Sequence, residues 1–341
     1  MNESHTGTSM TTTTPNISVS SYANGESFGN LIPTEEASFR NYIVILNEKS
    51  GSANLPSLKN YMEERSRALG KNVVFLELNK EMDLGKELTT ARDEQGTDVY
   101  IAAGGDGTLA SVAHFARLHS KIFAAIPCGT ANVFAKEHAI PSNPHEAAEL
   151  ALTGSRTAMV DVLDVSGKTY LCHISIGTYS WITLHTNAES KRKYGRIAYV
   201  ANAIKLMMQD KIFHFEIVAD GKRLLRRAST IMVTNAGSMG ATSMRWGENI
   251  VSDDGIAEIC IFKARTLKHY FALLFTFILR KPHHPLKEYV QVFREASVKG
   301  SKELPVRADG ERIANGSFSF KIVHNALRVL VPESFHGTGK A

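Results

Sequence analysis

Cysteine and long apolar runs are both scarce in this chain of 341 residues. Its three cysteines (Cys128, Cys172 and Cys260) stand far apart and form no C-x-x-C pair, which leaves a zinc ribbon or a C-x-x-C redox site unsupported. Buried thiols in a reducing compartment are the simpler expectation and predict a cytoplasmic protein. The most apolar stretch, 270–279, is far shorter than the roughly 20 residues that span a bilayer. The N-terminus lacks a charged segment followed by an apolar run, so no secretory signal is expected.

Positive charge is missing from residues 1–39, which hold four acidic residues, no lysine or arginine, and many Ser, Thr, Asn and Gly. This composition is typical of a disordered tail. The formal charge of +5 therefore divides into an acidic tail and a remainder of +9. A basic body favours an anionic partner, such as a nucleotide or a phospholipid surface. Nucleic acid is not expected, because no basic stripe with interleaved aromatic residues occurs.

Residues 40–158 are predicted to form a three-layer α/β nucleotide-binding domain. Apolar runs of strand length alternate with segments of helical periodicity, and Pro144 suits the first turn of the last helix. Alternation of this kind favours a parallel sheet that is covered by helices on both faces. The expected strands are 42–46, 73–78, 99–103 and 122–126, and the expected helices are 55–69, 84–95, 108–119 and 144–152.

From about residue 159 the pattern changes to short strands that are separated by turn signals such as Asp220-Gly221 and Asn315-Gly316. We expect an all-β second domain over residues 159–324, a sandwich or partly open barrel. A last strand near 325–333 is expected to return to the first domain, and one helical segment, 196–208, interrupts the strands. The expected strands are 160–165, 170–176, 213–219, 228–234, 256–262, 295–298, 318–323 and 327–331.

The sharpest motif is the glycine-rich loop Gly104-Gly105-Asp106-Gly107-Thr108. It follows an expected strand and opens an expected helix, which is where open α/β sheets bind ligands. Glycines let the backbone approach a phosphate closely, and a helix N-terminus presents free N–H groups to it. Asp106 would be repelled by phosphate unless a cation lay between them, so it is a candidate Mg²⁺-linked residue. A purely structural turn would rarely need three glycines around an aspartate.

Two other phosphate-binding patterns fit this region poorly. The dinucleotide fingerprint expects an acidic residue at the end of the next strand, but that strand ends in Pro127, and the Walker pattern is absent. Instead, the loop after that strand contains Gly129, Thr130 and Asn132, of which the last two would also suit a helix N-cap. Loops on neighbouring parallel strands face one crevice, so a shared nucleotide explains them better than unrelated turns. The loop after the first strand adds polar residues suited to phosphate or ribose: Asn47, Ser50 and Gly51.

In this order, the loops resemble those of the diacylglycerol kinase catalytic-domain family of lipid kinases in its bacterial soluble form, to which sphingoid-base and ceramide kinases are related. The N-x-x-S-G, G-G-D-G-T and P-x-G-T-x-N-x-F-A motifs occur in the family's order and spacing. Further matches follow at 193–199, 253–259 and 309–311. The resemblance runs from about residue 41 to 332. G-G-D-G-T alone is shared with NAD kinases, whereas the full ordered set is more specific to lipid kinases.

The resemblance implies ATP- and Mg²⁺-dependent transfer of a phosphoryl group to a lipid hydroxyl. Asp106 would interact with the Mg²⁺ ion that is bound to the nucleotide. Glu311 would be the general base that accepts the hydroxyl proton, with Asp309 as its close support. From the residues alone, Asp309-Gly310 is an ordinary hairpin turn. Diacylglycerol is the default acceptor, and a sphingoid base, ceramide or phosphatidylglycerol stays open.

The same resemblance implies a structural Mg²⁺ at the turn around Asp254. Its ligands would be the Asp254 carboxylate and main-chain carbonyls near Val251 and Ile256. Oxygen ligands suit a hard cation of this kind. From the residues alone, the sequence at this point predicts only a turn.

Some positions depart from the family pattern. Such kinases commonly continue G-G-D-G-T with Asn-Glu, where this chain has Ala110 and Ser111. Their second loop commonly has Asp where this chain has Val133, and their first loop often has Pro where it has Glu48. These differences leave open an altered acceptor, or a catalytically weak lipid-binding protein that kept the fold. The acidic residues retained in the G-G-D-G-T and D-G-E motifs favour an active kinase. A nucleotide kinase similar to NAD kinase is the other alternative to a lipid kinase.

Basic clusters at 191–193 and at Arg280-Lys281 lie next to apolar segments. Apolar segments edged by basic residues are typical of proteins that touch anionic lipid, so we expect peripheral contact with an anionic membrane surface. For the apolar segment 270–279 itself, a helix buried in the core is the expectation. The sequence leaves open whether the chain forms a homodimer.

Overall fold

The computed structural model describes residues 31–32, 39–47, 54–79, 81–184, 211–240, 244–247, 249–281 and 283–337. Two predicted nucleotide-binding residues, Ser50 and Gly51, lie outside the described residues. So do the expected helical segment 196–208 and the basic cluster 191–193. Among the residues that the structure does describe, no helix is both long enough and apolar enough to cross a membrane.

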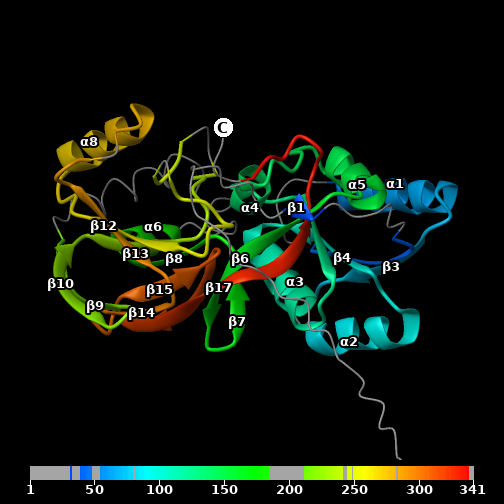
Figure 1. The fold of residues 1–341 in the computed structure, drawn as a ribbon, viewed down its shortest axis with the longest axis horizontal. Coiled ribbons are helices and arrows are strands. Elements are labelled where there is room, and N and C mark those ends of the chain that lie inside the picture. Colours follow the sequence, from blue (N-terminus) through cyan, green and yellow to red (C-terminus); the bar gives the residue numbers. More distant parts are fainter. Residues whose placement is uncertain are drawn as a thin grey trace, which may run out of the picture.

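A parallel sheet with helices on both faces forms the N-terminal part of the protein. Its strands are β2 (Asn41–Leu46), β3 (Asn72–Glu77), β4 (Val99–Gly104) and β5 (Ile122–Pro127), in the order β3–β2–β4–β5. Its helices are α1 (Leu55–Ala68), α2 (Leu84–Gln95), α3 (Asp106–Leu118), α4 (Val133–Glu137) and α5 (Pro144–Thr153). In Figure 1, α1 and α5 lie on one side of the strands, and α2 and α3 on the other. Every residue of β4 and β5 is buried, as is typical of strands covered on both faces.

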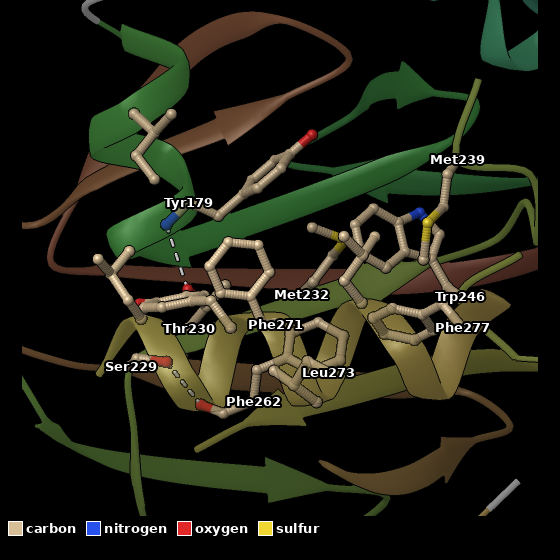
Figure 2. Close-up of a pocket in the computed structure, with 14 residues that line it drawn as sticks. Tyr179, Ser229, Thr230, Met232, Met239, Trp246, Phe262, Phe271, Leu273 and Phe277 are labelled. Atoms are coloured by element: carbon tan, nitrogen blue, oxygen red, sulfur yellow. Dashed lines mark hydrogen bonds between the residues drawn. The ribbon is translucent and has the colours of Figure 1, made fainter. Parts of the chain in front are cut away.

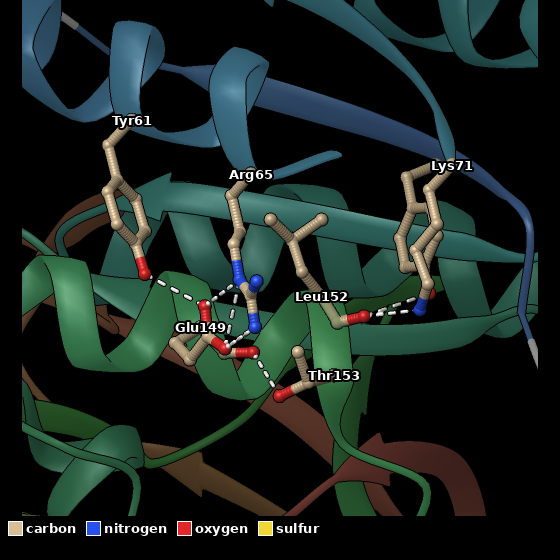
Figure 3. Close-up of polar contacts among 7 residues, drawn as sticks. Tyr61, Arg65, Lys71, Glu149, Leu152 and Thr153 are labelled. Carbon is tan, nitrogen blue, oxygen red and sulfur yellow. Dashed lines mark hydrogen bonds and ion pairs between the residues drawn. The ribbon is translucent and has the colours of Figure 1, made fainter. Parts of the chain in front are cut away.

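A polar cluster fastens α5 to α1 on the outer side of this domain (Figure 3). The Arg65 guanidinium holds the Glu149 carboxylate through Nη2–Oε1 and Nε–Oε2 distances of 2.6 and 2.8 Å, and the Tyr61 hydroxyl donates to the same carboxylate at 2.8 Å. Lys71 Nζ donates to the carbonyl oxygen of Leu152 nearby. The Arg65 hydrogen bonds are the main cause that lowers the pKa of Glu149. Because both side chains are partly exposed, solvent screens the pair and its contribution to stability is small.

Two antiparallel layers form the C-terminal part of the protein. One is a sheet in the order β13–β12–β11–β8–β15–β16, and the other contains β9, β10 and β14. The apolar core lies between these layers and includes Phe215, Ile259 and Val298. The elements are β8 (His173–Gly177), α6 (Thr178–Leu184), β9 (Phe213–Ala219), β10 (Lys222–Ala228), β11 (Thr230–Thr234), β12 (Ala257–Phe262), α8 (Leu267–Ile278), β13 (Lys287–Val292), β14 (Glu295–Lys299), β15 (Pro305–Ala308) and β16 (Glu311–Asn315).

One long strand, β17 (Ser317–Leu330), joins the two parts (Figure 1). It pairs antiparallel with β14 and with β6 (Thr157–Val165), and parallel with β5 through Val329 and Phe123. The remaining short strands, β1 (Leu31–Ile32) and β7 (Lys168–Tyr170), both pair with β6. A single sheet therefore runs through both parts of the protein. The α/β domain followed by a β-sandwich is confirmed, while the residue limits of the domains stay a prediction.

Three strand predictions differ from the structure for identifiable reasons. The expected strand 170–176 is interrupted, because the backbone N–H groups of Leu171 and Cys172 bond to the Asp309 carboxylate instead of a neighbouring strand. The expected strand 228–234 divides at Ser229, where the chain passes from one sheet to the other. The expected strands 318–323 and 327–331 are one strand with a bulge, at which Asn325 N donates to the buried Asp161 carboxylate at 2.8 Å.

The expectation of a core helix at 270–279 was wrong. Helix α8 buries only Leu273 and Thr276, while Phe271, Phe275 and Ile278 are each more than half exposed. Aromatic and aliphatic side chains on both faces of this helix make it look like a core segment in the sequence. The expectation for the three cysteines was correct, since all three are buried free thiols.

Candidate active site

The glycine-rich loop connects β4 to α3 at the carboxyl end of the parallel sheet. Gly105 is the N-cap of α3, and no described side chain caps this helix, so its first N–H groups are left for a ligand. A Cβ added at Gly104 would lie 2.5 Å from Cβ of Thr108. Thr108 Oγ1 in turn accepts a hydrogen bond of 2.7 Å from Nδ2 of Asn47. The predicted first loop and the glycine-rich loop therefore meet at this point.

The loop after β5 packs directly on the glycine-rich loop. A Cβ at Gly129 would lie 2.7 Å from Cα of Gly105, so the two backbones can approach this closely only because residue 129 is glycine. Asn132 closes its own loop, accepting from Gly129 N at 2.9 Å and donating to Gly129 O at 3.1 Å. Thr130, by contrast, is exposed and lies outside the cavity described below.

Asp106 links the two loops. Its Oδ1 accepts a hydrogen bond of 3.2 Å from Phe134 N in α4. Burial, with a smaller effect of the nearby Asp309 carboxylate, raises the pKa of Asp106. The backbone of Val133 also bonds to this carboxylate, and because a carboxylate has about four lone-pair positions, acceptor capacity for a cation is left.

Asp309 lies across from this loop and is 2% exposed. Its carboxylate accepts three backbone hydrogen bonds, from Leu171 N at 2.6 Å and from Cys172 N and His173 N at 3.0 Å each. Burial raises the pKa of Asp309 to about 6, although these hydrogen bonds oppose the shift. Its backbone φ of 44° places it in the left-handed region. The Asp309 carboxylate is therefore held in place by the backbone of the segment that leads into β8.

Glu311, two residues later, has a free approach to the cavity. Its side chain is 46% exposed, and Oε2 lies 3.3 Å from Nζ of Lys168. A Cβ placed on Gly107 would be 3.4 Å from Glu311 Oε1 and 3.3 Å from the carbonyl oxygen of Asp309. The D-G-E turn of the β-sandwich therefore touches the glycine-rich loop of the α/β domain.

Between these two turns lies a cavity of about 470 Å³. The structure brings seven of the predicted site residues to its wall: Asn47, Gly105, Asp106, Gly107, Thr108, Asp309 and Glu311. Sequence reasoning missed its other polar side chains, which come from β8, α6 and β15: His173, Ser175, Tyr179, Thr183 and Arg307. Alternation along β8 and β15 was the signal that could have found some of them, since every second residue faces the cavity.

A second, apolar pocket of about 410 Å³ lies beneath α8 (Figure 2). Figure 2 shows aromatic and aliphatic side chains from α8 and the sheet closing around it, among them Phe262, Leu273 and Phe277. Tyr179, Met239 and Trp246 line this pocket and the polar cavity alike. The two spaces therefore adjoin at these three side chains.

The predicted structural metal residues lie together on the turn before β12, away from the cavity. Asp254 Oδ1 accepts from Ile256 N at 2.9 Å. Nearby, Oε2 of the buried Glu258 has no hydrogen-bond partner among the described residues, and burial, with Asp254 adding to it, raises the pKa of Glu258 to about 8. A carboxylate oxygen without a hydrogen-bond partner, such as Oε2 of Glu258, is the kind of ligand that a hard cation prefers. The described residues contain no cluster of three or more His, Cys, Asp or Glu side chains suited to a metal, so carbonyl groups such as that of Val251 would have to complete the site.

An α/β domain with a glycine-rich loop, facing an acidic turn of a β-sandwich across a cavity, is the architecture of a two-domain kinase. Residues 41–165 match the diacylglycerol kinase catalytic domain. Residues 172–331 match the YegS C-terminal NAD kinase beta sandwich-like domain. The chain therefore carries a diacylglycerol kinase catalytic domain followed by a YegS-type β-sandwich domain, which is the domain organisation of a lipid kinase.

Individual relatives agree with this assignment. The chain is 26% identical to a probable lipid kinase YegS-like of Cronobacter sakazakii over 259 residues, which cover 73% of this chain and 83% of the relative. It is 39% identical over 122 residues to a probable lipid kinase YegS-like of Stenotrophomonas maltophilia, covering 33% and 39% of the two chains. A crystal structure of a diacylglycerol kinase from Bacillus anthracis superposes with a TM-score of 0.70 at 21% identity, covering 88% and 99% of the two chains. This last likeness concerns the fold.

Proposed function

We propose that this lipid kinase transfers the γ-phosphate of ATP, with Mg²⁺, to the hydroxyl of a lipid whose acyl chains lie in the apolar pocket beneath α8. The observation that carries the proposal is the junction of the two spaces at Tyr179, Met239 and Trp246. A lipid seated there would have its chains among apolar side chains and its hydroxyl beside the acidic turn. A nucleotide acceptor such as NAD would have no use for an apolar pocket next to the site.

The residues have distinct tasks in the proposed reaction. The oxygen of the lipid hydroxyl forms a bond to the γ-phosphorus, and the bond from that phosphorus to the β–γ bridging oxygen breaks, so that ADP leaves. The hydroxyl proton passes to the Glu311 carboxylate, which Asp309 positions by fixing the turn. The glycine-rich loop and the N-terminus of α3 hold the phosphates. Mg²⁺ would be bound near Asp106 and would neutralise charge on the phosphates.

We further propose that α8 docks on an anionic membrane surface. Three large side chains that take no part in the pocket are more than half exposed on it or at its end: Phe275, Ile278 and Leu279. Exposed basic residues bracket the helix, with Lys268 near its start and Arg280 and Lys281 after its end. Apolar side chains flanked by cations complement the acyl and headgroup regions of an anionic bilayer. Phe271, which is exposed and also lines the pocket, would place the pocket entrance at the bilayer.

Transfer of radiolabel from [γ-³²P]ATP to a lipid extract tests the function. The wild type is expected to label a lipid in a Mg²⁺-dependent manner, and Asp106→Ala is expected to abolish the label. Thr130→Ala is the matched control, since Thr130 lies in the adjacent loop but outside the cavity, and its label should equal that of the wild type. Label on NAD alone, or no label on any lipid, would overturn the proposal.

A further inference from the structure

We propose that the acceptor lipid carries an anionic group close to its hydroxyl and that the guanidinium of Arg307 binds this group. The inference rests on the proposed function and narrows its acceptor class. A buried cation in the cavity would make no specific contact with a neutral acceptor lipid, and it would repel an acceptor that carries an amine. Both kinds of acceptor are therefore disfavoured.

Arg307 reaches the cavity by strand alternation. It stands on β15 opposite Ser175 on β8, and its neighbours Val306 and Ala308 face the core of the sandwich. Ser175 lines the same cavity as Arg307. His173, two residues before Ser175 on β8, lines it as well. The outer face of these two strands is therefore a polar floor for the cavity.

The guanidinium of Arg307 is buried, and burial lowers its pKa, although the nearby Tyr179 and Glu311 side chains oppose that shift. The residue is 8% exposed, and within the described part of the chain it takes part in no ion pair. Its one hydrogen bond goes from Nη2 to the carbonyl oxygen of Gly310. Arginine carries five N–H donors and stays charged in proteins, so most of this donor capacity is unused. A buried guanidinium that no carboxylate contacts directly is costly, and an anionic ligand in the cavity would lower that cost.

A second polar atom without a hydrogen-bond partner lies on the same side of the cavity. Nδ1 of His173 is buried and has no hydrogen-bond partner among the described residues. Burial lowers the pKa of His173, so its ring is neutral near pH 7 and donates from one nitrogen. A ligand that accepts hydrogen bonds from both Arg307 and His173 is best supplied by a group with several oxygens, as in a phosphate diester or a carboxylate.

The position of Arg307 places this anion on the acceptor side. The His173 ring lies 6.3 Å from the Tyr179 ring, which in turn lies 6.1 Å from the Trp246 ring at the wall of the apolar pocket. Figure 2 shows the Tyr179 hydroxyl pointing away from α8. A lipid with chains in the pocket would thus pass Tyr179 and present its headgroup to Arg307. The phosphates of ATP have their own donors in the glycine-rich loop of the other domain.

The test compares phosphatidylglycerol with diacylglycerol bearing the same acyl chains. Both are presented at one low mole fraction in vesicles of constant phosphatidylserine content, so that surface charge is equal and the background lipid offers no free hydroxyl. The wild type, Arg307→Gln and Arg307→Lys are assayed for kcat/KM of each acceptor and for KM of ATP. Binding of each lipid is followed in parallel by Trp246 fluorescence in Trp181→Phe protein, where Trp246 is the only tryptophan.

The wild type is expected to prefer phosphatidylglycerol, and Arg307→Gln to lower its kcat/KM for that acceptor by about 10- to 100-fold through KM. In the same variant the loss should be smaller for diacylglycerol than for phosphatidylglycerol, KM for ATP should stay within about twofold of the wild type, and Arg307→Lys should recover part of the loss. Equal use of both acceptors by the wild type would overturn the inference and leave the lipid kinase intact. A rise in KM for ATP with both acceptors would assign Arg307 to the nucleotide phosphate, again overturning it. Absence of label on every lipid would instead overturn the proposed function.

Discussion

The polar cavity and the apolar pocket are built by different means, although they share a wall. The polar cavity combines loop backbone with side chains of β8, α6 and β15, and the fit of its two phosphate-side loops depends on Gly129, where an added Cβ would lie 2.7 Å from Cα of Gly105. Side chains of strands and helices line the apolar pocket, where other apolar side chains of similar size would form an equivalent surface. We therefore expect single substitutions in the polar cavity to abolish turnover, and substitutions around the apolar pocket to change how lipid is reached and chosen.

The largest effect is expected for Glu311→Gln. The amide cannot accept the hydroxyl proton, so kcat should fall by about 10²- to 10⁴-fold while KM for ATP stays near that of the wild type. Steady-state kinetics with a saturating lipid acceptor measure both constants. Glu303→Gln removes an exposed glutamate outside both spaces and should behave as the wild type. A kcat for Glu311→Gln within threefold of the wild type would exclude Glu311 as the base.

Gly129→Ala should come next. Its Cβ would lie 2.7 Å from Gly105 Cα and 2.8 Å from Asn132 Oδ1, so the two loops must separate. We expect KM for ATP to rise by about tenfold or more, because backbone N–H groups aimed at phosphate would be displaced. Thr130→Ala, in the same loop, should leave that KM unchanged. A normal KM in Gly129→Ala, in protein with an unchanged thermal midpoint, would contradict nucleotide binding between these loops.

A smaller effect is expected from the outer face of α8. Phe275 is 58% exposed and does not line the pocket, so Phe275→Glu should weaken binding to anionic vesicles several-fold without altering the site. Vesicle sedimentation measures the binding, and turnover of a short-chain lipid in free solution should stay normal. Phe293→Glu is the matched control, since Phe293 is equally exposed but lies between β13 and β14. Equal losses in both variants would argue against a docking role for α8.

A separate comparison concerns stability at the predicted structural metal turn. Glu258 has a folded pKa of about 8 against an ordinary value of 4.5. An acid whose folded pKa is raised destabilises the fold as pH rises from its unfolded toward its folded pKa, by at most about 1.4 kcal/mol for each pH unit in that interval. Glu258→Gln should therefore gain stability over the wild type in metal-free buffer as pH rises from about 5 to 8. Thermal melts measure this, with Glu303→Gln as the control, and a pH-independent difference would contradict the raised pKa.

The fold and the position of the glycine-rich loop could be predicted from sequence because local rules determine them. Alternating apolar runs give the parallel sheet, and strand–glycine–helix junctions place Gly104 to Thr108 at its edge. Asp309 and Glu311 were predicted as site residues only through the family resemblance, because local sequence rules predict no more than a turn at these positions. The contact between that turn and Gly107 depends on the strand β17, which passes from the β-sandwich to the α/β domain. No local sequence pattern specifies this pairing.

The acceptor side could not be predicted, because its residues come from ordinary-looking strands. Arg307 and His173 belong to short alternating segments with no motif, and only the pairing of β8 with β15 brings them together. The exposed face of α8 was missed for a different reason. Its sequence is apolar all round, so periodicity could not reveal that Phe271 and Phe275 face outward.

The central claim is that a lipid lies in the apolar pocket while its hydroxyl reaches Glu311. A diacylglycerol or phosphatidylglycerol with a diazirine at the end of one acyl chain tests this directly, with crosslinked peptides located by mass spectrometry after incubation with MgATP. We predict crosslinks within α8 and at Trp246 or Met232, and a phosphate on the crosslinked lipid that is absent in Glu311→Gln. Crosslinks confined to surfaces away from α8, or phosphorylated lipid that never crosslinks in the pocket, would contradict the account.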